Sequence, residues 1–415
     1  MRRWSPFAAG AAVLLLAGLG ATVVSERTEA APLPGLLTDA SWRAAAVDPD
    51  AVPDEEWLAA GTVPGQDGPW DEMVRSSLLD LRALTKANGA VAAGPASKWN
   101  YAWPRDSAFA AVAFSATGHS EEALDVLGFL EDVQLDDGGF QARYLLDGTG
   151  TPDGRTRQAD GAGWALWALG EVVQDVRDEG RPATARRELT ALEPLLDAAT
   201  GFVMDATEDG RTLPAPSPDY WERRETRLTL GTVAPLLAGL RASAELHSVL
   251  GEDAAADELE AAADSLEGLL EREFAPTGYL RYADPDLESG GVDASVAFLL
   301  PPFAPGRTSG DVLAAFDAYQ VDALRPAGGL APGVGWKQDG VSWTPEVALV
   351  AYTAAAAGRT EQATAWLDWL NAHRTGWGAL PEKVLPDGSP AGPAPLGWTA
   401  AQVVLAVDAL DDLGG

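Results

Sequence analysis

Tryptophan residues recur beside Arg, Asp and Glu residues in several polar stretches of this chain. The first stretch runs from Lys98 to Asp106 and reads Lys-Trp-Asn-Tyr-Ala-Trp-Pro-Arg-Asp; the clearest later one, Pro218 to Glu222, reads Pro-Asp-Tyr-Trp-Glu. A sugar ring has apolar C–H faces and a rim of hydroxyls, so flat aromatic walls with fixed carboxylate or guanidinium groups suit it. Tryptophan offers a large apolar face and one hydrogen-bond donor. These stretches therefore favour a carbohydrate site.

The candidate binding residues come from separate stretches, most of them shortly before an expected apolar helix. They are Trp103, Arg105, Asp106, Gln158, Asp160, Tyr220, Trp221, Trp336, Asp339 and Trp398. For any single tryptophan, a place in the core at the start of a helix is an equally good interpretation. Asp106 and Asp160 stand where helices are expected to begin, so each could simply be an N-cap. On spacing alone, Glu222 and Glu382 could be ordinary surface carboxylates.

Apolar periodicity predicts twelve helices that must position these residues. They lie at about 69–88, 106–117, 120–134, 160–178, 183–199, 226–248, 251–273, 293–300, 309–324, 344–357, 360–374 and 396–413. The odd-numbered helices are amphipathic, whereas the even-numbered ones are apolar on nearly every side, as in Trp164–Leu169 and Val347–Tyr352. A helix that is apolar all round is buried all round. The even-numbered helices should therefore form an inner ring and the odd-numbered ones an outer ring.

The links between these helices alternate in length as well. Links after the even-numbered helices are mostly short, whereas the links before them are far longer than is usual in a compact domain, and such long loops usually carry function. Since the inner helices all begin at the same end, the long loops should meet at one mouth. The sequence thus predicts an all-α fold, an (α/α)6 barrel of twelve helices over residues 67–415. Pro235 lies inside the sixth helix and should kink it or delay its regular part.

Five motifs follow one another in the long loops and at the starts of the inner helices. They are Trp103-Pro-Arg-Asp106, Gln158-Ala-Asp-Gly-Ala-Gly-Trp164, Asp219-Tyr-Trp-Glu222, Val292-Asp-Ala-Ser295 with Leu299-Leu-Pro301, and Pro381-Glu382 with Pro395-Leu-Gly-Trp398. In this order, from about residue 70 to the C-terminus, they resemble glycoside hydrolase family 15. This is the glucoamylase-like family of exo-acting, inverting α-glucosidases. The resemblance implies a carbohydrate substrate and no cofactor or metal.

The matching motifs imply that Glu222 corresponds to the general acid of the family and Glu382 to its general base. Arg105 and Asp106 correspond to the pair that grips the non-reducing terminal sugar, and Gln158 and Asp160 resemble the next pocket loop. In an inverting pair, one carboxylic acid protonates the leaving oxygen while the other carboxylate activates water, with the carboxyls about 6.5–9.5 Å apart. Arg223 stands where many relatives have a second glutamate, and trehalose- and dextran-cleaving members exist. The linkage is therefore left open.

Composition limits the alternatives. The net charge is −33, from 62 acidic and 29 basic residues. Lys and Arg do not cluster in the sequence, which argues against a surface that binds nucleic acid. The chain has no cysteine and three widely spaced histidines, which excludes thiol chemistry and disfavours a His-centred triad. Two other readings remain: a different (α/α)6 enzyme, such as a lyase, and a non-catalytic, surface-anchored glycan-binding protein.

The N-terminus predicts export. Arg2 and Arg3 precede an apolar run over residues 7–24, and positive charge before such a run favours a cytoplasmic N-terminus and an exported remainder. We interpret residues 1–25 as a signal peptide or a membrane anchor and residues 26–66 as a linker. The protein is then expected to be extracytoplasmic, either secreted or tethered to the outer face of the membrane, and monomeric.

Overall fold

The structure is a computed structural model, and it describes residues 41–46, 52–95, 97–287, 290–306 and 308–414. The described residues belong to one compact unit. The expected signal or anchor segment, residues 1–25, lies outside the described residues. Among the described residues, no helix has both the length and the apolar character needed to cross a bilayer.

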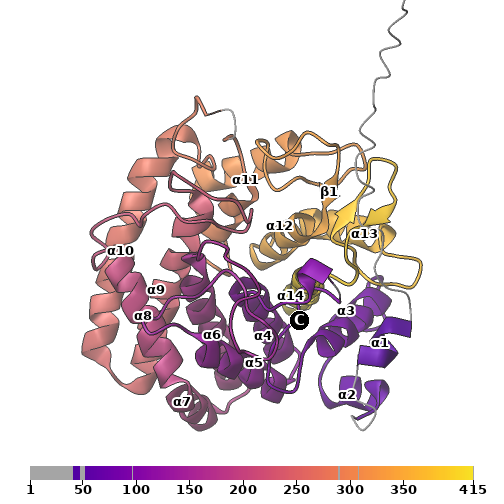
Figure 1. Cartoon of the computed structure of the whole chain (residues 1–415), viewed down its shortest axis with the longest axis horizontal. Helices are drawn as coiled ribbons and strands as arrows, with labels where there is room; N and C mark the ends of the chain where they lie inside the picture. Colours follow the sequence, from indigo (N-terminus) through magenta and orange to yellow (C-terminus); the bar gives the residue numbers. More distant parts are fainter. Residues whose placement is uncertain (1–40, 47–51, 96, 288–289, 307, 415) are drawn as a thin grey trace, which may run out of the picture. The chain divides into compact units, whose positions relative to one another are not determined.

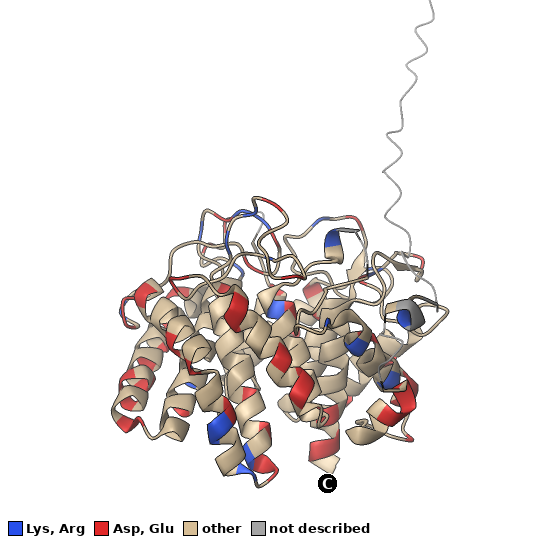
Figure 2. Ribbon diagram, turned by 60° about the horizontal axis from the view of Figure 1, so that its bottom comes forward, with Lys and Arg blue, Asp and Glu red and all other residues tan. Residues whose placement is uncertain are grey.

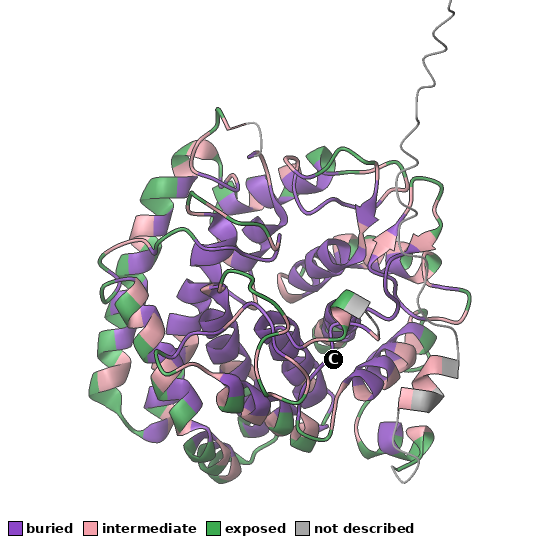
Figure 3. Ribbon diagram, viewed as in Figure 1, coloured by how far each residue is buried: buried purple, intermediate pink, exposed green. Residues whose placement is uncertain are grey.

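Within the described part of the chain, six elements form a closed inner ring. They are α4 (Pro104–Ala116), α6 (Asp160–Asp178), α9 (Leu230–Leu250), the 3-10 helix η3 (Ala294–Leu299), α12 (Thr344–Ala356) and α14 (Gly397–Gly414). Each packs on the next in this order, and α14 packs back on α4 (Figure 1). The apolar sequence of these helices is the cause: in α4, every residue from Pro104 to Ser115 is buried. Figure 3 shows the same burial through the other inner helices.

Amphipathic helices cover this ring from outside. They are α3 (Asp71–Leu84), α5 (Ser120–Val133), α7 (Pro182–Ala191), α8 (Glu193–Ala206), α10 (Asp253–Phe274), α11 (Gly310–Asp322) and α13 (Thr360–Ala372). In α10, Leu259, Leu266 and Leu270 are buried, and the helix packs on α9. The predicted (α/α)6 barrel, with inner and outer helices alternating along the chain, is therefore confirmed.

Three elements differ from the sequence-based expectation. The helix expected at 183–199 is two helices, α7 and α8, which meet at Leu192, and Pro194 lies in the first turn of the second. Proline lacks the N–H that a continuous helix would need. The eighth expected helix is the six-residue η3, which ends just before Pro301 and Pro302. The sixth helix, expected to begin at 226, begins at Leu230, in line with the delay expected from Pro235.

Two glycines let the inner helices α6 and α9 approach closely. A Cβ added at Gly163 would lie 2.2 Å from the carbonyl oxygen of Pro235, and one at Gly239 would lie 2.7 Å from the Cα of Gly163. Both distances are far below van der Waals contact, so only glycine fits at this crossing.

Part of the segment expected to be a linker is helical. It contains α1 (Ser41–Ala46) and α2 (Asp54–Ala60). Trp57 of α2 is buried, stacks on His119 with ring centroids 3.7 Å apart and donates a hydrogen bond to Glu122 at 2.5 Å. Burial of this one indole ties α2 to the outer side of the barrel, which the weak periodicity of the segment did not indicate.

The long loops lie at the N-terminal end of the inner helices, as Figure 2 shows. Short antiparallel pairings join them. β2 (Lys383–Val384) pairs with β1 (Ser342–Trp343) and with β3 (Pro390–Ala391), while isolated bridges link Ala102 to Tyr144 and Phe140 to Gln158. These pairings fix loops that are distant in sequence against one another, and thus position the side chains that they carry.

Candidate active site

A cavity of about 300 Å³ lies among the long loops. Glu222 and Glu382 both line it, although 160 residues separate them in the sequence. Of the predicted binding residues, Trp103, Arg105, Asp106, Tyr220, Trp221, Trp336 and Trp398 line it as well. The expectation that separate loops contribute to one site is therefore realised for most of the predicted residues.

The walls of this cavity are rich in tryptophan. Six tryptophans line it, namely Trp99, Trp103, Trp221, Trp336, Trp343 and Trp398. The indole nitrogens of all but Trp99 are buried and have no hydrogen-bond partner among the described residues. The walls thus offer large flat apolar faces, which suit the C–H faces of a sugar ring.

A tight turn presents Glu222 to the cavity. The carboxylate of Asp219 accepts a hydrogen bond from the backbone N–H of Trp221 at 3.0 Å, and the Glu222 N–H donates to the Asp219 carbonyl at 2.8 Å. Glu222 has a φ of 55°, a conformation that costs a non-glycine residue free energy and is found preferentially at functional sites. The backbone strain is consistent with a side chain that has to point in one direction.

Three polar side chains contact the carboxylate of Glu222. Arg155 donates to Oε2 at 2.7 Å, Gln158 donates to Oε1 at 2.8 Å, and the Arg105 guanidinium lies 3.6 Å from Oε1. Gln158, a predicted binding residue, thus acts here by orienting Glu222, and it does not line the cavity. In this conformation the two arginines and the amide of Gln158 fix the orientation of the carboxylate.

Glu382 is held between two loops. Its N–H donates to the Pro393 carbonyl at 2.9 Å, and its own carbonyl accepts from the Thr344 N–H at 3.0 Å. In the side chain, Lys383 lies 2.7 Å from Oε2 and the Trp99 indole donates to Oε1 at 3.3 Å. These two contacts fix the orientation of the Glu382 carboxylate at the cavity.

Arg105 and Asp106 form a buried pair at the start of α4. The guanidinium donates to Asp106 Oδ2 at 3.1 Å and stacks 4.6 Å from the Trp398 ring centroid. Burial raises the pKa of Asp106 to about 6, and the charge of Arg105 opposes this rise. Asp106 lies at the third helical position, and the residue at the N-cap of α4 is Trp103. The alternative reading of this residue as an N-cap is therefore wrong.

Asp160 lies close to Arg105 without lining the cavity. It is buried, is the first residue of α6 and makes no capping bond, and it accepts a hydrogen bond from the Trp164 indole at 3.3 Å. Burial raises its pKa to about 7, although the charge of Arg105 opposes the rise. Asp160 therefore lies outside the cavity lining and acts on the site through its charge beside Arg105.

The structure does not bring Asp339 to the cavity. This side chain is exposed, and its carboxylate accepts the backbone N–H of Val341 at 3.1 Å, as in a tight turn. Trp336, three residues earlier, does line the cavity.

Sequence reasoning missed the buried arginine that holds the Glu222 loop. Arg281 is fully buried and lies 2.8 Å from Asp219, 2.9 Å from Glu225 and 3.5 Å from Asp293. Its guanidinium also stacks 3.8 Å from the Trp221 ring centroid. Burial alone would lower the pKa of Arg281. The negative charges of Asp219 and Asp293 outweigh this effect and raise its pKa well above the usual value.

A further glutamate lines the cavity, at the start of α12. Glu346 is buried, and its Oε2 atom has no hydrogen-bond partner among the described residues. Burial raises the pKa of Glu346 to about 8, and the nearby charge of Glu382 adds to the rise. A neutral carboxyl at this position can donate as well as accept a hydrogen bond. In the sequence, Glu346 is a single acidic residue directly before the apolar run Val347–Tyr352, and this position indicated a place at the start of an inner helix.

Comparison with known proteins agrees with this geometry. No family model matches the chain. The isomaltose glucohydrolase of Kribbella flavida is 26% identical over 339 residues, which cover 75% of this chain and 83% of that protein. A wild-type glycosidase has the same fold with a TM-score of 0.68 at 23% identity, covering 87% of this chain and 99% of its own.

The chain is a glycoside hydrolase with the fold of glucoamylases. Its fold is also that of a bacterial glucoamylase complexed with acarbose, with a TM-score of 0.71 at 17% identity over 86% of this chain and 57% of that one. The glucoamylase of Saccharomycopsis fibuligera matches with a TM-score of 0.66 at 13% identity over 93% of this chain and 98% of its own. A variant of the glycosidase was solved in complex with glucose. The predicted carbohydrate substrate of this hydrolase is thus supported.

A larger hollow of the hydrolase lies elsewhere, between α6, α9 and α10. Its volume is about 750 Å³, but no aromatic side chain lines it, and Arg177, Arg241 and Glu245 are among its polar residues. A sugar needs an aromatic wall more than it needs volume. The smaller cavity with Glu222 and Glu382 is therefore the active-site candidate of this glucoamylase-like hydrolase.

Proposed function

We propose that this hydrolase is exo-acting and releases glucose from the non-reducing ends of α-gluco-oligosaccharides with inversion. Glu222 is the general acid and Glu382 the general base. The observation that carries the proposal is that these two glutamates, from separate loops, line one tryptophan-walled cavity. A volume of about 300 Å³ is at the small end of ligand sites, which suits a terminal sugar better than the middle of a polymer.

The two carboxyls then divide the chemistry. The glycosidic oxygen approaches Glu222, which donates its proton as the C1–O bond breaks. Glu382 accepts a proton from a water that attacks C1 from the opposite face, so that the product is β-glucose. In the structure Arg155 contacts Oε2 of Glu222, so in this scheme the guanidinium moves away where Oε2 is the oxygen that donates the proton.

Several neighbours bind the terminal sugar in this scheme. Arg105 and Asp106 hold its hydroxyls, Trp398 and Trp103 cover its apolar faces, and Glu346 donates a hydrogen bond from its neutral carboxyl. A buried polar atom without a partner in the protein costs about 1–3 kcal/mol. Binding of a sugar hydroxyl at Glu346 Oε2 removes that cost.

The substrate is an oligosaccharide rather than starch in this proposal, and the α-1,6 linkage is the first to test, because the relative with 26% identity is an isomaltose glucohydrolase. The proposed location is extracytoplasmic. It is supported by Arg2 and Arg3 before the apolar run at 7–24, which would act as a signal peptide or as a membrane tether.

The purified protein incubated with isomaltose, maltose, trehalose, dextran and starch tests this function. Release of glucose from at least one disaccharide, abolished in Glu382→Gln, is the expected result. If none of the five is hydrolysed while glucose or a disaccharide still binds, the glycan-binding alternative replaces the proposed enzyme.

A further inference from the structure

The cavity is lined by an unexpected number of cations for so acidic a protein. The chain has 29 Lys and Arg against 62 Asp and Glu. Yet six basic residues line this one cavity: Lys98, Arg105, Arg143, Arg155, Lys337 and Lys383. In Figure 2, basic positions are prominent among the loops above the helices, where the long loops gather. The positive charge is thus concentrated where the substrate enters.

The acidic residues of the cavity do not balance these cations. Four acids line it, Asp106, Glu222, Glu346 and Glu382. Glu346 is largely neutral at pH 7, because burial raises its pKa to about 8. Six positive charges then face three negative ones, those of Asp106, Glu222 and Glu382. Asp153, which pairs with Arg143 and approaches Arg155, removes only part of the excess.

A neutral sugar gives this excess no partner. Arg105 and Lys383 already pair with Asp106 and Glu382, and Arg105 can also hold the hydroxyls of a neutral sugar. The excess therefore lies in the other cations of the cavity. A negative charge on the substrate would give them a partner.

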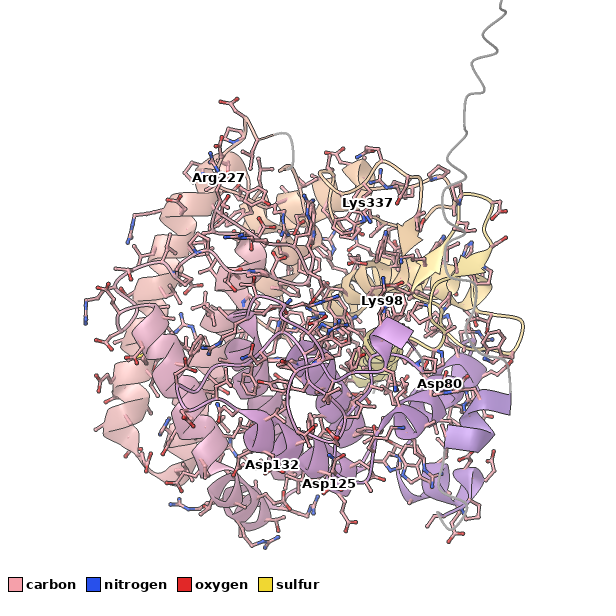
Figure 4. All side chains as sticks on the ribbon, viewed as in Figure 1. Asp80, Lys98, Asp125, Asp132, Arg227 and Lys337 are labelled. Carbon is pink, nitrogen blue, oxygen red and sulfur yellow. The ribbon has the colours of Figure 1, made fainter. Side chains whose placement is uncertain are left out.

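Two of the cations are free to bind such a charge. Lys98, in the loop before α4, and Lys337, in the loop before α12, are exposed and form no ion pair with any residue that the structure describes. Figure 4 labels both, and they reach the cavity from different loops. The ammonium group of Lys337 also lies 5.4 Å from the ring centroid of Trp336. Both side chains are thus exposed and line the cavity, as a site for the leaving sugar unit requires.

Arg155 connects this region to catalysis. Its guanidinium already binds a carboxylate, that of Glu222 at 2.7 Å, and its side chain is 36% exposed. A carboxylate on the leaving unit would compete for the same guanidinium. Once Arg155 turns to the substrate, Glu222 loses its closest ion-pair contact and its Oε2 atom becomes available to the glycosidic oxygen.

We propose, building on the proposed hydrolase function, that the preferred substrates are α-glucosides whose leaving unit is a sugar acid. Lys98, Lys337 and Arg155 bind its carboxylate. Binding of the substrate thereby draws Arg155 away from its contact with Glu222 Oε2.

A matched pair of substrates tests this proposal. Isomaltitol and isomaltobionate both carry an open-chain leaving unit and differ only in a CH₂OH or carboxylate group; maltitol and maltobionate form the same pair for the α-1,4 linkage. We expect kcat/KM to be about 3–10-fold higher for the aldonate at low salt, as two or three partly exposed ion pairs would give. The preference should largely disappear in 0.5 M NaCl, because salt screens exposed charges.

Variants locate the effect. Lys98→Gln and Lys337→Gln should each lower the aldonate preference, whereas Arg187→Gln on the outer helix α7, with a side chain 71% exposed, should leave it unchanged. Arg155→Gln should abolish the preference. Hydrolysis of the alditols at a rate equal to or above that of the aldonates would overturn the proposal while leaving the hydrolase function intact. If no glucoside is hydrolysed, the proposed function fails and this proposal fails with it.

Discussion

Arg281 and Asp219 form an ion pair at 2.8 Å in which neither side chain is exposed to solvent. The pair joins the loop that ends at η3 to the turn that carries Glu222. Removing one member of a buried pair leaves an uncompensated charge, which typically costs about 3–5 kcal/mol.

We therefore expect Arg281→Met to lower the free energy of unfolding by about 3–5 kcal/mol and to reduce kcat/KM by misplacing Glu222. Denaturant unfolding and a disaccharide assay measure the two effects. Arg241→Met is the control: Arg241 pairs with Asp264 and Glu267, whose side chains are 67% and 48% exposed, so its loss should cost at most about 1 kcal/mol. Equal losses in the two variants would contradict the structural role given to Arg281.

The two glutamates should be indispensable for turnover but not for stability. Glu222→Gln and Glu382→Gln are each expected to lower kcat by about 10²–10⁴-fold, the usual contribution of general acid–base groups, with unchanged thermal unfolding. Asp339→Asn provides the contrast, because Asp339 is exposed and caps a turn; its activity should match that of the unmodified protein. If Asp339→Asn lost as much activity as the glutamate variants, the location assigned to the active site would be wrong.

A glycine beside the base offers a sharper test of position. A Cβ at Gly392, where φ is 79°, would lie 2.8 Å from Oε2 of Glu382, whereas a Cβ at Gly358, where φ is 70°, would meet nothing within 4 Å. Both alanine variants suffer the backbone strain of a positive φ, of order 1–3 kcal/mol. Only Gly392→Ala should also lower kcat, by at least about tenfold, which a shift of 1 Å in a catalytic group can easily cause. Similar kcat values in the two variants would show that Glu382 tolerates displacement.

Stability should fall as the pH rises from 5 to 8. Burial raises the pKa of Glu346 to about 8 and that of Asp160 to about 7, whereas both groups ionise near pH 4 in the unfolded chain. Between these values the folded protein holds protons that the unfolded chain has released, so each group lowers the free energy of unfolding as pH increases. Each contributes up to about 1.4 kcal/mol per pH unit in that window.

Glu346→Gln should flatten this dependence, since an amide does not titrate. Thermal unfolding across pH 5 to 8 measures it, and the variant and the unmodified protein should differ most at pH 8. A steeper slope in Glu346→Gln than in the unmodified protein would contradict the assignment of a proton to the folded form of Glu346.

The fold and most of the cavity lining could be predicted from the sequence because they depend on local patterns. The run Val347–Tyr352 forms a helix that is apolar on every side. Such a helix has to be buried, so its place in the inner ring could be predicted. Trp103, Arg105 and Asp106 lie at the boundary between a long loop and such a helix, and this position alone brings them to the mouth of the barrel.

The remaining site residues depend on pairings between loops. Arg281 contacts Asp219, 62 residues away, and Arg155 contacts Glu222, 67 residues away; neither arginine has a local pattern that distinguishes it from a surface residue. Asp339 illustrates the opposite error, since an aspartate near a pocket tryptophan can equally cap its own turn. Lys383 follows Glu382 directly, but its ion pair with Glu382 depends on the geometry of the short β2 strand.

The anomer released in the first turnovers tests the central claim most directly. Proton NMR of isomaltose or maltose hydrolysis, recorded before mutarotation is complete, should show β-glucose appearing first, because water held by Glu382 attacks C1 from the face opposite to Glu222. Initial release of α-glucose would mean retention of configuration, and the roles assigned to Glu222 and Glu382 would then be wrong.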